Sequence, residues 1–365
     1  MMRIENIKAD IYRFEIPIPY TKNEIDYRVI VICRIDTDDG QVGYGMADGL
    51  ILGRSTKVAL EHDILDTIKG MDPYDTEAIH DRIWWKLNPR SVTGVIFSAI
   101  SALDIACWDL RGRAENRSIA SLLGGHKDFA NAYVTFGFPQ YDFDQLVEAA
   151  RAQAKLGTQR LKMVVPAELG WRENVRRVRA VREAIGDDVD LMIDANQKFT
   201  PNLARQLVRE VEECRITWFE EPVYQNDAEA LHELKTHTRI PLAAGQAEGH
   251  RWRMREFMER RALDIIQPNV CNDGGYTEAR KVAHMAQAFN MPVANGGGWG
   301  IFNMHLIAAM MNGMWAEFPL GMVEVARRAF KNPPEPVNNV VKIPDAPGLG
   351  FEPDFEQLAD YVLKD

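Results

Sequence analysis

The sequence is poor in the features that mark several common classes of protein. Its 365 residues include four cysteines, with no Cys-x-x-Cys pair and no zinc-ligand spacing. We therefore expect reduced, mostly buried thiols in a cytoplasmic protein. No stretch reaches the ~18 apolar residues of a membrane span. Residues 1–12 lack the basic start and apolar core of a signal peptide. The sequence thus predicts no association with a membrane.

Positive charge is scarce as well. Lys and Arg number 43 against 53 Asp and Glu, which gives a net charge of −10. A protein that coats nucleic acid needs clustered positive charge, so this composition argues against nucleic acid as a partner. The net charge of the chain does not constrain the charge of a buried pocket, so a small anionic substrate is compatible with this composition.

Residues 1–125 are predicted to form an α+β domain. Glu5–Phe14 and Tyr27–Arg34 have the composition of strands, and Asp39-Gly40 predicts a hairpin turn that returns the chain as Gln41–Tyr44. Apolar residues then recur with helical spacing along Ile96–Ala114.

Residues 126–320 alternate short β-rich runs with charged amphipathic stretches. This pattern predicts an α/β fold with eight parallel strands, a TIM-like barrel rather than a doubly wound sheet. Residues 321–365 are Pro-rich and then helical, and we expect them to return to the first domain. The predicted strands are Ala132–Phe136, Leu161–Val165, Val189–Asp194, Ile216–Glu220, Ile240–Ala244, Leu263–Gln267, Met291–Ala294 and Met314–Glu317.

Oxygen-bearing side chains follow three successive predicted strands. Asp194 and Glu220 end the third and fourth strands and Gln246 follows the fifth, at a regular spacing of 26 positions. Active sites of such barrels lie at the carboxyl ends of the strands, so these side chains should share one rim. Two carboxylates and an amide oxygen suit Mg²⁺ better than zinc. The alternative is that the acids only cap loops.

Further motifs resemble the enolase superfamily, most of all its mandelate racemase/muconate lactonizing enzyme branch. The resemblance covers essentially the whole chain. It implies a (β/α)7β barrel with an N-terminal α+β capping domain, and a homo-oligomer, dimer or octamer. It also implies Mg²⁺ that binds a substrate carboxylate while the proton α to it is removed. Besides the three strand ends, the motifs are Ser101–Gly112 (SALDIACWDLRG), Leu122–Gly125, Asp264–Pro268, Gly274-Gly275 and Asp345–Gly350 (DAPGLG).

Four positions depart from the pattern of that branch. Lys162 matches the first lysine of its Lys-x-Lys motif, but Val164 stands where the second lysine, the usual base, is expected. Gly296 replaces the histidine of the opposite face, and Asn269 replaces the aspartate that pairs with it. Gln246 replaces a glutamate that ligates the metal, so we expect weaker metal binding. Amides in place of acids indicate a repurposed polar pocket.

Three residues are candidates for catalytic roles. Lys162 is the first candidate for the base, although its role could be electrostatic only. Glu317 ends the eighth strand, where related proteins often carry a glutamate that contacts substrate. Lys198 lies four residues beyond Asp194 and could instead be a solvated loop charge. The candidates for substrate binding are Asn196, Asn269, Asn295, Tyr20 and Arg28, the last two from a flexible segment of the capping domain.

The preferred hypothesis is a Mg²⁺-dependent lyase or isomerase that acts on a small hydroxy or sugar acid. Dehydration is favoured over racemisation because a racemase needs a base on each face of the substrate, and Lys162 is the one base visible. Two alternatives stay open: a catalytically silent member that binds an acid ligand, and a different chemistry that uses Lys198, His250 or Glu317. His80 is predicted to be solvated and His305 to be a packed core residue.

Overall fold

The computed structural model describes residues 2–49, 52–87 and 93–363 of the chain. The chain begins with a three-stranded antiparallel sheet. Its strands are β1 (Ile4–Pro17), β2 (Ile25–Thr37) and β3 (Val42–Asp48). The predicted Asp-Gly turn joins β2 to β3. Gly40 has a φ of +82° there, in the left-handed region that such turns favour.

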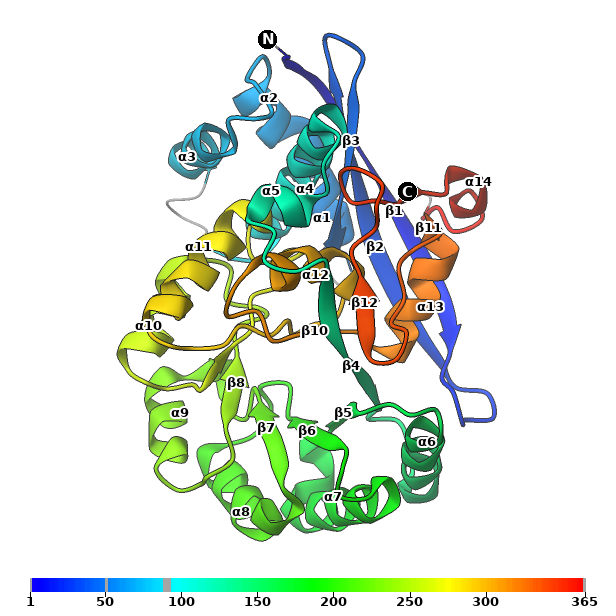
Figure 1. Ribbon diagram of the computed structural model, residues 1–365, viewed down its shortest axis with the longest axis vertical. Helices are drawn as coiled ribbons and strands as arrows, with labels where there is room; N and C mark the ends of the chain where they lie inside the picture. Colours follow the sequence, from blue (N-terminus) through cyan, green and yellow to red (C-terminus); the bar gives the residue numbers. More distant parts are fainter. Residues whose placement is uncertain (1, 50–51, 88–92, 364–365) are drawn as a thin grey trace.

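One long helix, α4 (Val95–Glu115), packs on this sheet and matches the predicted helix closely. Its close approach to β3 depends on Gly45, because a Cβ atom there would lie 1.9 Å from the carbonyl oxygen of Ala102. The capping domain is blue to green-cyan in Figure 1. Its helices lie above the barrel strands, and its strands β1 and β2 extend down beside them. Its other helices are α1 (Gly53–Val58), α2 (Leu65–Ile68), α3 (Thr76–Leu87) and α5 (Ile119–Leu123).

Parallel strands form the second, larger part of the molecule, as predicted. From β4 to β9 each strand pairs with the next along the chain, and the last strand, β10, pairs with β4. They are β4 (Phe129–Gly137), β5 (Arg160–Val164), β6 (Asp190–Asp194), β7 (Ile216–Glu220), β8 (Leu242–Ala244), β9 (Ile265–Ile266) and β10 (Trp315–Glu317).

Val293 takes the seventh position of the barrel, between β9 and β10. It pairs in parallel with Ile266 on one side and with Gly313 on the other. The amide of Ala294 also donates to the carbonyl of Ile266 over 3.1 Å, which continues the ladder. The predicted strand Met291–Ala294 is thus reduced to isolated bridges, but the ring still closes.

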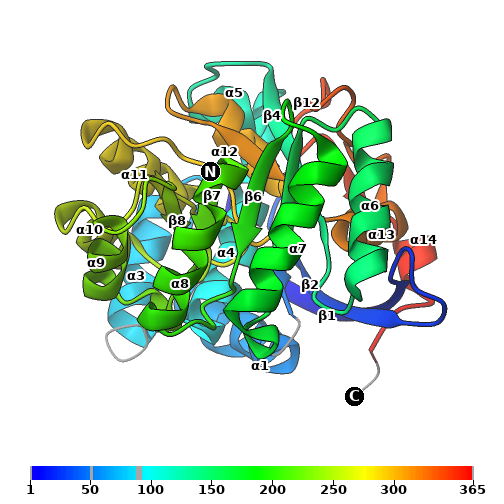
Figure 2. The same cartoon turned by 90° about the horizontal axis from the view of Figure 1, so that it is seen from below.

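Helices cover the outside of the barrel, and the first five follow one another around it (Figure 2). Their sequences are amphipathic. In α8, for example, Ala204, Leu207, Val208 and Val211 form the buried face, and Thr200 caps the first turn by accepting from the amide of Leu203. The helices are α6 (Phe143–Lys155), α7 (Gly170–Ile185), α8 (Pro201–Val211), α9 (Ala228–Lys235), α10 (Arg251–Glu259), α11 (Gly275–Ala288), α12 (Gly300–Ala309) and α13 (Leu320–Ala329).

Bulky side chains fill the inside of the barrel. Tyr133, Met192 and Trp218 form one buried cluster there with Ala243 and Ala294. The indole of Trp218 also donates to Glu220 over 3.1 Å. The packed interior therefore supports, from below, a polar layer at the carboxyl ends of the strands.

The last segment of the chain contacts both parts of the molecule. Its β12 (Val340–Lys342) pairs antiparallel with β4. The amide of Leu363 donates to Ile11 of β1, and the amide of Arg13 donates to Tyr361. Figure 1 shows this red segment beside the blue strands. Its other elements are β11 (Phe330–Lys331), β13 (Glu352–Pro353) and α14 (Phe355–Leu358).

The acids of the SALDIACWDLRG motif join the capping domain to the rest of the chain. Asp104 accepts from the amide of Thr277 at the start of α11 and contacts His80 at 2.9 Å. The prediction that His80 is solvated is therefore wrong, because its own helix gives no sign of this contact with Asp104. Asp109 is fully buried and accepts from the amides of Tyr44 and Leu349. Both motif acids thus serve the packing of domains.

The cysteines and His305 were expected to be buried. All four cysteines are free and buried, as predicted. Within residues 2–49, 52–87 and 93–363, no helix has the length and apolar character needed to cross a membrane. His305 is buried as predicted, and its Nε2 contacts the carbonyl of Leu349 at 3.1 Å.

His305 should make the fold sensitive to acid. Burial lowers its pKa from 6.5 to about 4. The unfolded chain therefore takes up a proton near pH 6.5, while the folded protein resists it until about pH 4. We expect the free energy of unfolding to fall by about 3 kcal/mol across this window from this residue alone. Denaturant titrations of wild type and His305→Gln, which keeps a donor for Leu349, should diverge as the pH drops. Parallel pH profiles would contradict the assignment.

Candidate active site

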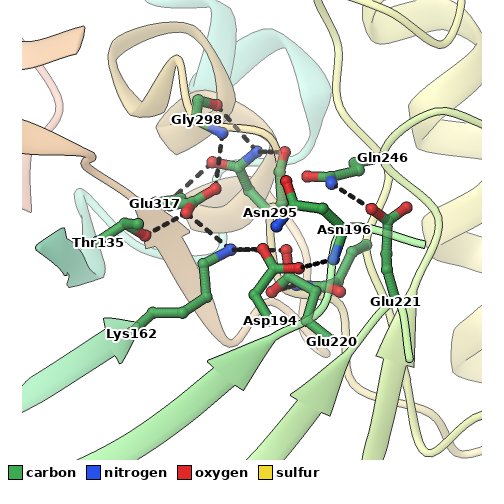
Figure 3. Close-up of polar contacts among 12 residues, drawn as sticks. Thr135, Lys162, Asp194, Asn196, Glu220, Glu221, Gln246, Asn295, Gly298 and Glu317 are labelled. Carbon is green, nitrogen blue, oxygen red and sulfur yellow. Dashed lines mark hydrogen bonds and ion pairs between the residues drawn. The ribbon is translucent and has the colours of Figure 1, made fainter. Parts of the chain in front are cut away.

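Four charged side chains meet where the barrel strands end. Lys162 comes from β5, Asp194 from β6, Glu220 from β7 and Glu317 from β10. In the strand register Asp194 is the direct partner of Glu220. Closure of the barrel brings Glu317 beside Lys162, although 155 residues separate them in the sequence. The predicted rim of polar residues is therefore present as one cluster (Figure 3).

Lys162 is the centre of this cluster. Its side chain is only 2% exposed, and its Nζ lies 2.6 Å from Glu220, 2.8 Å from Glu317 and 3.2 Å from Asp194. Burial by itself lowers the pKa of Lys162, but the carboxylates of Glu220, Glu317 and Asp194 more than reverse this effect. The pKa is raised well above the usual lysine value. Lys162 is thus an ammonium ion in this arrangement.

The carboxylate of Glu317 accepts two hydrogen bonds and forms one ion pair. Its Oε1 accepts from the hydroxyl of Thr135 and pairs with Lys162, and its Oε2 accepts from the backbone amide of Gly298 over 2.6 Å. Its own backbone amide donates to Asn295. The carboxylate of Glu317 is therefore fixed in orientation. One oxygen contacts Lys162, and the other contacts the glycine-rich loop, residues 296–300.

Negative charge exceeds positive charge in the cluster. Burial is the main cause that raises the pKa of Asp194 to about 6 and of Glu220 to about 8, and Lys162 opposes both shifts. A further acid, Glu221, is 2% exposed, and burial raises its pKa to about 7. One ammonium among four buried carboxylates leaves the site suited to a further cation.

Glu221 was not predicted as a site residue. Its neighbour Glu220 points into the barrel, and side-chain alternation along a strand would turn Glu221 away. The chain instead turns here, with a φ of +42° at Glu221. Its carboxylate accepts from the amides of Gln197, Asn226 and Gln246 over 2.9, 2.9 and 2.7 Å. The adjacent acids of Glu-Glu-Pro were the one signal that could have indicated it.

The residues at the rim fit a divalent cation if an amide oxygen completes the set. Within the described residues, no three His, Cys, Asp or Glu side chains are arranged to hold a metal ion. Asp194 and Glu220 supply two carboxylates, and the Oε1 of Gln246 is buried with no hydrogen-bond partner in the described part of the chain. Such an oxygen needs a donor or a cation. Asp194, Glu220 and Gln246 are therefore the residues that could hold Mg²⁺, which prefers oxygen ligands.

A cavity of about 240 Å³ opens above the cluster. Lys162, Asp194, Gln246 and Glu317 line its floor, and Val164 forms part of its wall. This volume lies just below the usual range of ligand pockets, which begins at about 300 Å³, and suits a small metabolite. Three other residues that were predicted to act in catalysis or substrate binding also line the cavity: Asn196, Lys198 and Arg28.

Arg28 and Lys198 reach the cavity from different parts of the molecule. Arg28 comes from the capping domain and pairs with Asp26 at 2.6 Å. Lys198 is 59% exposed and lies 3.9 Å from Glu168. The backbone amide of Asn196 donates to Asp194 over 2.7 Å. All of these residues line the same cavity.

The other predicted substrate-binding residues lie outside the lining of this cavity, among the described residues. Asn269 and Asn295 are fully buried, and both donate to the carbonyl of Gly296. Their side-chain amides hold the glycine-rich loop in place. Tyr20 packs edge-on against Tyr141, with ring centres 6.4 Å apart.

The positions that depart from the family pattern leave space rather than charge. Val164 contributes an aliphatic side chain to the cavity wall. At Gly296 a Cβ atom would lie 3.0 Å from Gln246 Oε1 and 3.2 Å from Glu220 Oε1. His250 caps α10 by accepting from the amide of Arg253 over 3.3 Å, and it does not line the cavity in the described part of the chain.

Comparisons with known proteins agree with this architecture. Residues 6–124 match the model of the mandelate racemase/muconate lactonizing enzyme N-terminal domain, and residues 145–358 match the enolase C-terminal domain-like model.

Two relatives span most of the chain. The arabinonate dehydratase of Saccharolobus solfataricus is 31% identical over 332 residues, which are 88% of this chain and 87% of the relative. The D-galactarolactone cycloisomerase of Agrobacterium fabrum is 30% identical and matches all of both chains.

Solved structures share the fold. A racemase from Streptomyces coelicolor, crystallised with bound magnesium, superposes with a TM-score of 0.90 at 27% identity, over 99% of this chain and 100% of that one.

Proposed function

The chain belongs to the mandelate racemase/muconate lactonizing enzyme branch of the enolase superfamily, and we propose that it is a Mg²⁺-dependent dehydratase of a small hydroxy or sugar acid. The observation that carries this proposal is the contact between Lys162 and Glu317 on the floor of the cavity, at 2.8 Å. It supplies both a proton acceptor and a proton donor. The names of the relatives, which include a sugar-acid dehydratase and a cycloisomerase, support the substrate class.

Asp194, Glu220 and Gln246 would hold the cation. When bound, it supplies positive charge to the substrate carboxylate as negative charge develops there. Lys162 lies against two of these ligands, and it adds a second positive charge at the same place once it has accepted the proton from the α-carbon. The α-carbon of a bound acid would then lie near the floor of the cavity, within reach of Lys162.

Lys162 and Glu317 form an acid–base pair for elimination. Transfer of a proton from Lys162 Nζ to Glu317 Oε1 gives a neutral amine and a carboxylic acid. The amine accepts the proton from the α-carbon, and the acid gives its proton to the hydroxide that leaves the β-carbon. One water is lost, a double bond forms between the two carbons, and both side chains return to their starting states.

Contacts with the rest of the substrate are assigned to the upper part of the cavity. Arg28 has a buried Nε without a hydrogen-bond partner among the described residues. Together with Asn196 and Lys198 it can bind hydroxyl or carboxylate groups distant from the reacting carbons. The role of Lys198 as base, contact of Tyr20 with substrate, and a homo-oligomeric, cytoplasmic protein stay predictions.

Calorimetry with Mg²⁺, followed by assays on a set of hydroxy and sugar acids, tests the proposal. We expect Asp194→Asn to weaken Mg²⁺ binding by at least about tenfold, because ligand charge sets affinity for such cations, and to abolish dehydration. Asp26→Asn is the matched control, since it removes an acid that lines the same cavity in the capping domain. Equal losses in both variants would contradict the assignment of Asp194.

A second function is favoured by one observation. The ammonium of Lys162 contacts Asp194, Glu220 and Glu317 at 2.6 to 3.2 Å, so the protein itself offsets part of their charge, as a protein that only binds an acid ligand would require. Binding of a sugar acid without turnover across the set, in the presence of Mg²⁺, would favour this silent binder over the dehydratase.

A further inference from the structure

The side-chain amide of Gln246 has one end bound and one end free. Its Nε2 donates to Glu221 Oε2 over 2.7 Å, while its Oε1 is buried and has no hydrogen-bond partner among the described residues. Figure 3 shows the amide with its nitrogen toward Glu221 and its oxygen pointing away from that carboxylate. A buried carbonyl oxygen without a partner costs free energy unless something binds it.

Glu221 determines this orientation. If the amide were reversed, its oxygen would face a carboxylate oxygen at hydrogen-bond distance, which is repulsive. Glu221 cannot move aside, because it is 2% exposed and its Oε1 accepts from both Gln197 and Asn226 over 2.9 Å. The amide of Gln246 is therefore held with its oxygen outward.

The free oxygen faces a space that two glycines leave open. A Cβ atom on Gly296 or Gly297 would lie 3.0 or 2.9 Å from Gln246 Oε1. The Cβ position of Gly296 is also 3.2 Å from Glu220 Oε1, so the amide oxygen and this carboxylate oxygen border the same space. Side chains at these two positions would obstruct the approach of an ion.

We propose that Glu221 is a positioning residue that makes Gln246 a ligand for a divalent cation. Glu221 does not contact the cation in this role; it fixes the amide so that the oxygen, and not the NH₂ group, faces Asp194 and Glu220. This inference rests on the metal-binding part of the proposed function. It explains how a site with a glutamine in place of a charged ligand keeps three oxygen donors.

The variant Glu221→Gln tests the proposal. The amide oxygen of the introduced side chain would take the place of Oε1, where it can accept from both Gln197 and Asn226. The introduced NH₂ group would then face the NH₂ group of Gln246, and Gln246 would reverse. We expect the affinity for Mg²⁺, measured by calorimetry, to fall 10- to 100-fold, as is typical when a group that orients a metal ligand is changed.

Two further variants separate positioning from a general loss of structure. Gln197→Ala removes a different hydrogen bond to the same carboxylate and leaves the contact with Gln246 in place, so Mg²⁺ affinity should stay within about twofold of wild type. In the double variant Glu221→Gln/Gln246→Glu, the new amide can donate to the new carboxylate. A carboxylate oxygen then reaches the cation, and Mg²⁺ affinity should return to at least the wild-type value.

The outcomes are distinct. Weak binding in Glu221→Gln with recovery in the double variant supports the inference. Unchanged affinity in Glu221→Gln, or an equal loss in Gln197→Ala, overturns it while the proposed function stands. A wild-type protein that binds no Mg²⁺ overturns the inference together with the metal-dependent dehydratase.

Discussion

Replacing Lys162 with methionine is expected to abolish dehydration and to lower the free energy of unfolding by about 3–5 kcal/mol. The ammonium is the shared partner of Asp194, Glu220 and Glu317 at the floor of the cavity. Removing one partner of a buried ion pair leaves charge that neither water nor protein compensates. Here three carboxylates lose their partner at once. Turnover of the best acid substrate and urea denaturation measure the two effects.

Lys198→Met is the matched control for Lys162→Met. Its ammonium also lines the cavity, but it is 59% exposed and lies 3.9 Å from Glu168. Exposed ion pairs contribute about 0–1 kcal/mol, so this variant should unfold as wild type does. If Lys162→Met retained more than a tenth of the wild-type kcat, Lys162 would not be the base. The same result would also contradict a purely electrostatic role for Lys162, because methionine carries no charge.

A cation should partly compensate for the missing ammonium in Lys162→Met. Asp194 and Glu220 keep their oxygens in that variant, and Mg²⁺ binding to the folded state alone stabilises it by mass action. The difference between wild type and variant in free energy of unfolding should therefore shrink as Mg²⁺ is added. The same titration thus tests the shared use of these two acids.

The strand ends could be predicted from the sequence because they depend on local pattern. Asp194 and Glu220 close β-rich runs that are separated by one strand-loop-helix unit, and parallel strands bring their carboxyl ends to one rim. Lys162 and Glu317 follow from the same argument. Each of these predictions needs only the period of the barrel and no knowledge of side-chain contacts.

The contacts among these residues could not be predicted, because they depend on closure of the barrel and on irregular backbone. Lys162 and Glu317 are neighbours only because β10 returns to β4. Glu221 reaches Gln246 only because its own φ is +42°, which breaks the alternation of the strand. Asn269 and Asn295 read as polar residues at strand ends, yet their amides hold the backbone of Gly296.

The structure shows that two acids of the family-like motif serve packing and do not belong to the site. Asp104 and Asp109 belong to the motif that most resembles the family, but they bind backbone amides at Thr277, Tyr44 and Leu349. They keep the capping domain in place, so that Arg28 and Asp26 can line the cavity. The proposed chemistry depends instead on Lys162 and Glu317, at the carboxyl ends of the barrel strands.

Replacing Glu317 with glutamine is expected to lower kcat for dehydration by about 10²–10⁴-fold, the usual contribution of a general acid or base. The oxygen of a glutamine can still accept from the amide of Gly298, and its NH₂ group can donate to the hydroxyl of Thr135. The glutamine cannot take a proton from Lys162 and pass it to the leaving hydroxide. The amide has nearly the same shape, so KM should change little. Steady-state kinetics on the best acid substrate, with thermal unfolding as a check on the fold, measures this effect.

Thr135→Val is the matched control, because it removes a donor to the same oxygen of Glu317 and keeps the carboxylate. Its kcat should fall far less than that of Glu317→Gln, since Lys162 and the amide of Gly298 still hold Glu317 in place. If the two variants lost activity equally, Glu317 would act through the shape of the pocket and not through a proton. Glu317→Gln with wild-type kcat would remove it from the mechanism, and proton delivery would then have to come from Lys162 alone.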